Sequence, residues 1–160
     1  MRRVFAGLAA LLALVIVVQF YLAASGAFST APKDESFRPH RALGYVIFLL
    51  PVVMTIVAAL ARMPGRLIGM AALVAGLTVV QVVIAVLAAA FDDSGNTSTT
   101  AGQLVFGLHG INGLIILALA MAVARRARAL PRSAVTARRA GAGNGAGTSG
   151  PAAGPAQPAS

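Results

Sequence analysis

Four long stretches without a single charged residue constrain this chain more than any other feature of its sequence. They cover residues 4–24, 42–61, 67–91 and 104–124. As a helix, each stretch is long enough to cross ~30 Å of hydrocarbon, for which about 20 residues are needed. The chain is 58% hydrophobic and 11% charged, whereas soluble domains carry about 25% charged residues. The sequence therefore predicts an all-α, polytopic membrane four-helix bundle and excludes a soluble enzyme.

The charged residues and the lack of cysteine narrow the function classes further. The net charge is +9, and the chain contains no cysteine. Beside membrane spans, arginine clusters are typical of contacts with anionic lipid headgroups, so the basic charge predicts no nucleic-acid partner. Without cysteine, disulfides, thiolate metal sites and iron–sulfur clusters are excluded. None of the apolar stretches contains a carboxylate, which disfavours a small proton-coupled exporter, because such transporters use a membrane-embedded acid.

The chain divides into a predicted four-helix transmembrane domain, residues 1–130, and a predicted disordered cytoplasmic tail, residues 131–160. After Arg139 the tail consists mostly of Ala, Gly and Pro, which offer too little apolar surface to offset the chain entropy lost on folding. The first span follows two arginines and ends in small residues, as a signal peptide does. Its apolar run, residues 4–24, is longer than the usual signal core of about 7–15 residues, so we expect a retained span, with cleavage as the alternative.

The basic residues predict the orientation in the membrane. With a cytoplasmic N-terminus, three of the 13 basic residues face outward, namely Lys33, Arg38 and Arg41, together with all four acids, and the other ten face inward. The positive-inside rule therefore predicts that both termini are cytoplasmic. All basic residues except Lys33 are arginine, a bias typical of GC-rich bacterial genomes. The expected location is a bacterial cytoplasmic membrane, crossed several times.

Few polar side chains interrupt the apolar stretches: Gln19, Thr55, Thr78, Gln81, His109 and Asn112, with His40 at the outer end of the second stretch. The two histidines share the pattern His-x-x-x-Gly, in residues 40–44 and 109–113. Positions i and i+4 lie on one face of a helix. Each glycine therefore leaves a surface without side chains beside its histidine, on which a flat macrocycle fits.

A second parallel indicates an internal repeat. The tripeptide Val-Val-Gln ends at Gln19 in the first stretch and at Gln81 in the third. Two hairpins related by an axis along the membrane normal place the second and fourth spans across the bundle from each other. His40 and His109 then face each other from opposite sides, which is the usual arrangement around a six-coordinate b-type haem. The predicted cofactor is haem b, with both histidines as iron ligands; the alternative is no cofactor.

The histidines also have a purely structural interpretation. Counted from the apolar starts at 1.5 Å per residue, His40 lies about 10 Å further out than His109, unless its helix begins before Pro39 or the helices tilt. If the offset is present, His40 is an interfacial residue, and His109 is a hydrogen-bond partner of Gln19 or Gln81.

The remaining irregular residues fit the same structural interpretation. The glycines at 107, 110 and 113 form a close-packing face, and Asn112 hydrogen-bonds between helices. Pro51 kinks its helix, and the Thr55 hydroxyl hydrogen-bonds to a backbone group that the kink leaves unpaired. A bundle locked in this way is a non-catalytic membrane scaffold or accessory subunit.

Residues 35–44 and 106–113 resemble a family of small actinobacterial four-span membrane proteins of unknown function, over about residues 1–130. More distantly, the chain is similar to one half-bundle of haem A synthase, whose halves carry a His-Arg pair, a Gln and a His on their second, third and fourth helices. The matching positions are His40, Arg41, Gln81 and His109, with Glu35 nearest to a family glutamate but five residues before the histidine instead of three. The family's loop cysteines and second half-bundle have no counterpart here. The resemblance therefore implies a haem-holding architecture and not haem A synthesis.

The leading hypothesis is a membrane protein that holds one b-type haem for electron transfer or haem handling. The predicted cofactor-binding residues are His40, His109, Arg38, Arg41, Gln81 and Asn112. The arginines would pair with the haem propionates, while the glutamine and the asparagine support the histidines. The expected partners are the lipid bilayer and a quinone or another membrane redox protein. No catalytic residue is predicted, and the sequence leaves open whether the chain is an enzyme.

Overall fold

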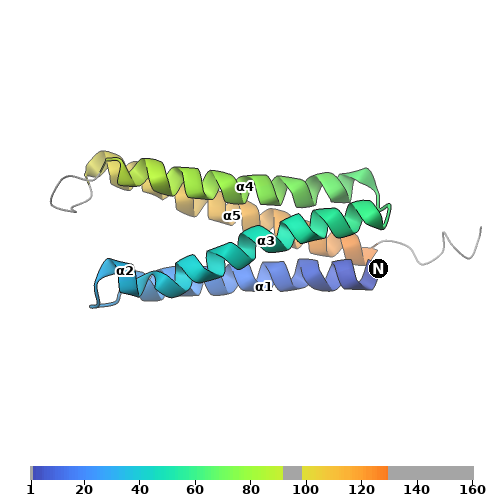
Figure 1. The fold of residues 1–160 in the computed structure, drawn as a ribbon, viewed down its shortest axis with the longest axis horizontal. Coiled ribbons are helices and arrows are strands. Elements are labelled where there is room, and N and C mark those ends of the chain that lie inside the picture. The colour runs from blue at the N-terminus through green and yellow to red at the C-terminus, as the bar shows by residue number, and fades with distance from the viewer. Residues whose placement is uncertain (1, 92–98, 130–160) are drawn as a thin grey trace, which may run out of the picture. The chain divides into compact units, whose positions relative to one another are not determined.

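The computed structural model describes residues 2–91 and 99–129 (Figure 1). Its helices are α1 (Arg2–Ala27), α2 (Lys33–Ser36), α3 (Arg38–Leu60), α4 (Gly65–Ala89) and α5 (Thr100–Ala129). Four of them are long and apolar enough to cross a membrane, and these two segments contain no strand. The predicted class, an all-α polytopic four-helix bundle, is confirmed.

Each long helix begins before the apolar stretch that predicted it, and α1 and α5 also continue past the end of that stretch. α3 begins at Arg38 with Pro39 in its first turn, where proline sacrifices no helical hydrogen bond. α5 continues past the apolar stretch through Arg128 to Ala129. Since the backbone of a helix satisfies its own hydrogen bonds, the helix need not end where the apolar residues end. The predicted tail, residues 131–160, lies outside the described residues.

The four long helices alternate in direction and form a square bundle. α1 and α4 each pack against both α3 and α5, whereas neither diagonal pair is in backbone contact within the described segments. α3 and α5 therefore lie across the bundle from each other, as the predicted repeat requires.

The two ends of the bundle differ in charge. The start of α1, the α3–α4 turn and the end of α5 lie together (Figure 1), and we call this the arginine end. Its described basic residues are Arg3, Arg62, Arg66, Arg125, Arg126 and Arg128. The opposite end carries α2, and we call it the α2 end.

The buried positions repeat from one hairpin to the other. In α1 they are Phe5, Ala9, Leu12 and Ile16, and 62 positions later α4 buries Leu67, Ala71, Val74 and Thr78. In α3 they are Ile47, Pro51, Met54 and Ala58, and 69 positions later α5 buries Ile116, Ala120, Val123 and Ala127. The α1–α3 and α4–α5 hairpins are thus two copies of one unit, related by an axis along the bundle.

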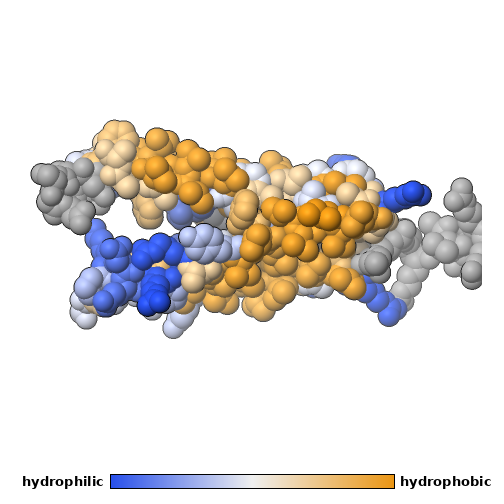
Figure 2. All heavy atoms as spheres, in the orientation of Figure 1, coloured by the Kyte–Doolittle hydropathy of each residue, from blue (hydrophilic) through white to orange (hydrophobic). Residues whose placement is uncertain are grey.

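This core fills only the half of the bundle near the arginine end. Towards the α2 end, α1 buries no side chain after Ile16, and α3 buries none before Ile47. Among the described residues, α4 buries only Ala88 after Thr78, and α5 buries no side chain before Asn112. Figure 2 shows the surface hollowed between the two hairpins at this end. The helices continue here without an apolar core between them.

Candidate functional site

In each hairpin a glutamine and a histidine hydrogen-bond to each other's backbone. In α1–α3, Gln19 Nε2 donates to the His40 carbonyl oxygen over 2.9 Å, and His40 Nδ1 lies 3.3 Å from the Gln19 carbonyl oxygen. In α4–α5, Gln81 Nε2 donates to the His109 carbonyl oxygen over 2.7 Å, and His109 Nδ1 lies 3.2 Å from the Gln81 carbonyl oxygen. The repeat therefore includes the polar residues as well as the core.

These bonds fix the protonation of both rings. A carbonyl oxygen can only accept, so Nδ1 must carry the proton in each neutral imidazole. The other nitrogen, Nε2, then presents a lone pair, and within the described residues neither Nε2 makes a hydrogen bond. Histidines that bind metals are held in this way, with one nitrogen donating to a carbonyl and the other free to ligate.

The two histidines lie side by side between the hairpins. Their ring centroids are 6.3 Å apart, and the ring planes meet at 44°. The depth offset of about 10 Å counted from the apolar starts is therefore absent, because α3 begins before Pro39, which is the condition under which that count does not apply. α3 begins at Arg38, so that His40 belongs to its first turn and reaches the level of His109. The structure pairs His109 with Gln81 and not with Gln19.

Two phenylalanines that were not predicted as site residues also belong to the site. Phe37 contacts His40 edge to face, with centroids 6.1 Å apart, and Phe106 stacks on His109, with centroids 4.9 Å apart and planes 9° from parallel. Each phenylalanine lies three residues before its histidine. Extending the repeated pattern to Phe-x-x-His-x-x-x-Gly would have found both.

The hairpins differ at the glutamine oxygens. Asn112 Nδ2 donates to Gln81 Oε1 over 2.5 Å and to the Leu77 carbonyl oxygen over 2.9 Å. At the equivalent place in α3 stands Leu43, which has no donor. Gln19 Oε1 is buried without a hydrogen-bond partner among the described residues. The second hairpin therefore has a closed polar network, and the first has an open one.

The two predicted propionate-binding arginines lie at the α2 end but off the histidine face. At 3.6 residues per turn, positions i−2 and i+1 point away from position i. Arg41 pairs with Asp34 of α2: its Nη1 lies 3.6 Å from Asp34 Oδ1, and its Nη2 also donates to the Asp34 carbonyl oxygen. Arg38 is exposed at the start of α3. Glu35, also in α2, is exposed.

The glycines that follow the histidines are less open than predicted. A Cβ added to Gly113 would lie 3.2 Å from the Phe20 ring, so this surface is covered by α1. A Cβ on Gly44 would meet the Gln19 amide nitrogen at 3.7 Å. Gly107 and Gly110 have nothing within 4 Å, so the predicted close-packing face does not extend to them.

The other polar side chains in the spans bond within their own helices. Thr55 Oγ1 donates to the Pro51 carbonyl oxygen over 2.7 Å, and α3 continues through the proline. Thr78 Oγ1 donates to the Ala75 carbonyl oxygen over 2.7 Å.

Within residues 2–91 and 99–129, no group of three or more His, Cys, Asp or Glu side chains is placed to hold a metal ion. A metal at this site would have only two histidines from the chain.

The comparisons with known proteins agree with the predicted resemblance to proteins of unknown function. Residues 19–90 match the "Family of unknown function (DUF6220)". The matched segment contains Gln19, His40 and Gln81 and ends before His109. No curated protein and no solved structure matches the chain.

Proposed function

We propose that this integral membrane protein binds one b-type haem between α3 and α5, for electron transfer or haem handling, with His40 and His109 as axial ligands. The histidine pair is the observation that supports this most. Two imidazoles approach from diagonal helices, 6.3 Å apart between centroids, and each is oriented through Nδ1 by the other helix of its hairpin.

The separation of the rings fits one metal between them. Metal–nitrogen bonds to histidine are about 2 Å long, and the ring centroid lies roughly 1 Å beyond the nitrogen. Two imidazoles on opposite sides of one metal are therefore about 6 Å apart. Two histidines alone make a poor zinc or copper site, whereas in a haem the porphyrin supplies the remaining four ligands.

The surroundings have space and charge for such a group. The half of the bundle near α2 has almost no apolar core, and the surface is hollowed there (Figure 2). Arg41 is paired with Asp34, and Arg38 is exposed at the start of α3 but lies off the histidine face. A propionate bound by Arg38 would therefore have to be reached by its long side chain from around the helix. Phe20 covers Gly113 and has to rotate before a macrocycle lies on that face.

Bound haem would supply a one-electron change at iron. The chain's own residues orient the ligands: the Gln19 and Gln81 carbonyls accept from Nδ1 and raise the basicity of each imidazole. Asn112 holds the Gln81 amide in place. A quinone or another membrane redox protein is the proposed electron partner.

The proposed orientation places the histidine pair near the outer face of a bacterial cytoplasmic membrane. Six of the described basic residues gather at the arginine end (Figure 1), and cytoplasmic loops are enriched in Lys and Arg. Tyr21 and Tyr45, on the α2 half, are 70% and 72% exposed, as expected of aromatic residues at a membrane–water interface.

The alternative function is a non-catalytic scaffold or accessory subunit without a cofactor. One observation favours it: in the α4–α5 hairpin, Gln81 and Asn112 satisfy each other and the backbone with no ligand present. On this alternative the polar residues only hold the helices together.

The test is the visible spectrum of the purified full-length protein, dithionite-reduced minus air-oxidised, after expression with haem precursor. We expect a sharp low-spin b-type α-band at near-stoichiometric haem. A colourless protein that takes up no added hemin would overturn the proposal and leave the scaffold.

Two replacements of His109 distinguish a role as an iron ligand from a role as a hydrogen-bond partner between helices. Methionine is an axial haem ligand but cannot donate to the Gln81 carbonyl, whereas asparagine can donate there and does not ligate. If haem binds, His109→Met keeps an altered α-band and His109→Asn loses it. If the histidine only joins helices, His109→Asn keeps the free energy of unfolding and His109→Met lowers it. Thr78→Val is the matched control, because Thr78 bonds only to its own helix.

A further inference from the structure

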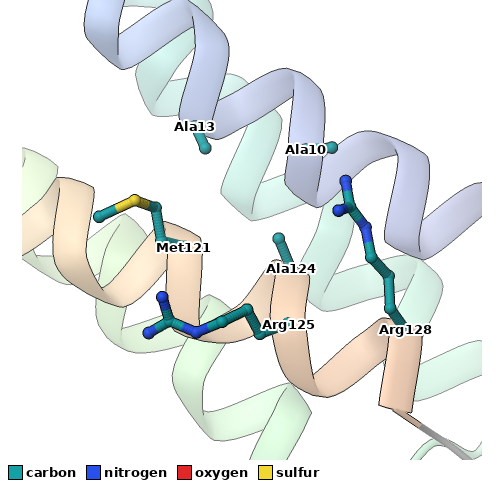
Figure 3. A pocket seen from close by; sticks show the side chains of 6 residues that line it. All are labelled: Ala10, Ala13, Met121, Ala124, Arg125 and Arg128. Atoms are coloured by element: carbon teal, nitrogen blue, oxygen red, sulfur yellow. The ribbon is translucent and has the colours of Figure 1, made fainter.

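A groove lies between α1 and α5 (Figure 3). Its residues belong to the first half of α1 and the last third of α5, so it lies near the arginine end and away from the histidine pair. Its volume is about 230 Å³, and its lining residues are Ala10, Ala13, Met121, Ala124, Arg125 and Arg128. On α5 these residues occupy positions i, i+3, i+4 and i+7 and form one stripe. In Figure 3 the guanidinium group of Arg128 is directed towards Ala10 of α1, whereas that of Arg125 extends along α5 on the side of Met121.

The groove carries positive charge without an internal counter-ion. The carboxylates of the described residues are Asp34 and Glu35, both in α2 at the other end of the bundle. The ion pair formed by these residues, between Arg41 and Asp34, also lies there. The neighbouring Arg126 is directed elsewhere, since its NH1 lies 3.1 Å from the sulfur of Met70 on α4. Arg125 and Arg128 are therefore the cations that an anion in this groove would meet.

The position and size of the groove indicate what occupies it. Arg125 follows directly on the apolar stretch of α5, which places its guanidinium at headgroup level when the apolar stretch spans the hydrocarbon. The volume of about 230 Å³ is below the range of about 300–1,000 Å³ typical of drug-sized ligand pockets. An apolar floor of Ala10 and Ala13 under two arginines fits a chain segment with a phosphate attached.

We propose that this groove binds an anionic phospholipid from the adjoining leaflet. The phosphate lies between Arg125 and Arg128, where guanidinium pairs with phosphate oxygens through charge-assisted hydrogen bonds. The glycerol and the first part of an acyl chain lie against Ala10, Ala13 and Met121. Because the α1–α5 interface closes the bundle, a lipid bound here also braces α1 against α5. This site is independent of the proposed haem.

Native mass spectrometry of the full-length protein, released from micelles with phosphatidylglycerol or phosphatidylcholine, tests the proposal. We expect tighter binding of phosphatidylglycerol, which Arg125→Gln and Arg128→Gln each weaken by roughly fivefold, from about 1 kcal/mol per basic residue at an anionic surface. The double variant Ala10→Leu/Ala13→Leu fills the groove, retains every charge and is expected to lose the same preference.

Arg126→Gln is the matched control, because it removes one charge from the same helical turn but outside the groove. An equal loss in Arg126→Gln, or full binding in the groove-filled variant, would show unspecific attraction to the basic end and overturn the proposal. Competition by inorganic phosphate alone at equal concentration would also overturn it, in favour of a simple anion site. Helical circular dichroism of each variant checks its fold, and an unfolded variant is replaced by Ala13→Val. The α-band of the haem is expected to stay unchanged in all of these variants.

Discussion

The two hairpins share a backbone plan but differ in the polar residues that they bring to the α2 end. In α4–α5, Asn112 completes the network around Gln81, and Phe106 stacks flat on His109. In α1–α3, Leu43 replaces the asparagine, Gln19 Oε1 has no hydrogen-bond partner within the described part of the chain, and Phe37 meets His40 only edge to face. The Gln81 side chain that bonds to the His109 backbone is therefore itself held by Asn112, whereas Gln19 has no such support, although both glutamines belong to the same repeated pattern.

This difference indicates how a repeated unit becomes specialised. The core positions repeat because both hairpins solve the same packing problem, and the reciprocal Gln–His bonds repeat because they close each hairpin. The residues around those bonds are free to differ. The second hairpin carries the closed polar network. The first carries the charged residues, with Arg38 and Arg41 where the second has Gly107 and Gly110.

The largest change in stability is expected when Asn112 of the second hairpin is replaced by leucine, the residue at the equivalent position 43 of the first hairpin. Asn112→Leu removes the donor to Gln81 Oε1 and to the Leu77 carbonyl oxygen. Leaving a buried acceptor unpaired costs about 1–3 kcal/mol, and we expect the free energy of unfolding in mixed SDS micelles to fall by an amount in that range. A loss no greater than that of the Thr78→Val control would show that this network does not distinguish the hairpins.

A smaller change in stability is expected when Gly44 and Gly113, the glycines that follow the two histidines, are each replaced by alanine. Replacing glycine by alanine inside a helix stabilises it by about 0.5–1 kcal/mol. At Gly44 the new methyl group meets only an ordinary contact, at 3.7 Å, so Gly44→Ala is expected to show this gain in thermal unfolding. At Gly113 it lies 3.2 Å from Phe20, so Gly113→Ala is expected to gain less or to lose stability. Equal gains at both positions would contradict this difference.

The smallest effect is expected from the reverse exchange. Leu43→Asn supplies a donor for Gln19 Oε1 at the position equivalent to Asn112. Hydrogen bonds between membrane helices contribute about 0.6 kcal/mol on average, and we expect a stabilisation of that size in the same SDS titration. Leu43→Ala serves as the control for lost packing. If both variants are destabilised equally, the two positions are not equivalent.

Much of the fold followed from the sequence because hydropathy is local. A run of apolar residues is long enough to span hydrocarbon whatever its neighbours are, so four charge-free stretches predicted four helices. The repeat was visible in Val-Val-Gln and in His-x-x-x-Gly because equivalent positions kept their residues. Phe37 and Phe106 repeat as clearly, but Phe106 does not stand out among its apolar neighbours, and Phe37 lies outside the apolar stretches, between Ser36 and Arg38.

The sequence by itself determined the membrane class, the number of spans and the residue types gathered at the α2 end. Only the tertiary structure decided which glutamine pairs with His109, that both imidazoles reach one level, and that Phe20 covers Gly113. These features depend on where a helix begins and how it is rotated against its neighbours. Pro39 is compatible with a helix that starts at Arg38, and the additional helical turn places His40 beside His109 and not at the interface that the alternative interpretation assigned to it. Which side chains pair between two helices depends on how far the helices are shifted along their axes and how they are rotated about them. The composition and periodicity of one helix give no information on either quantity.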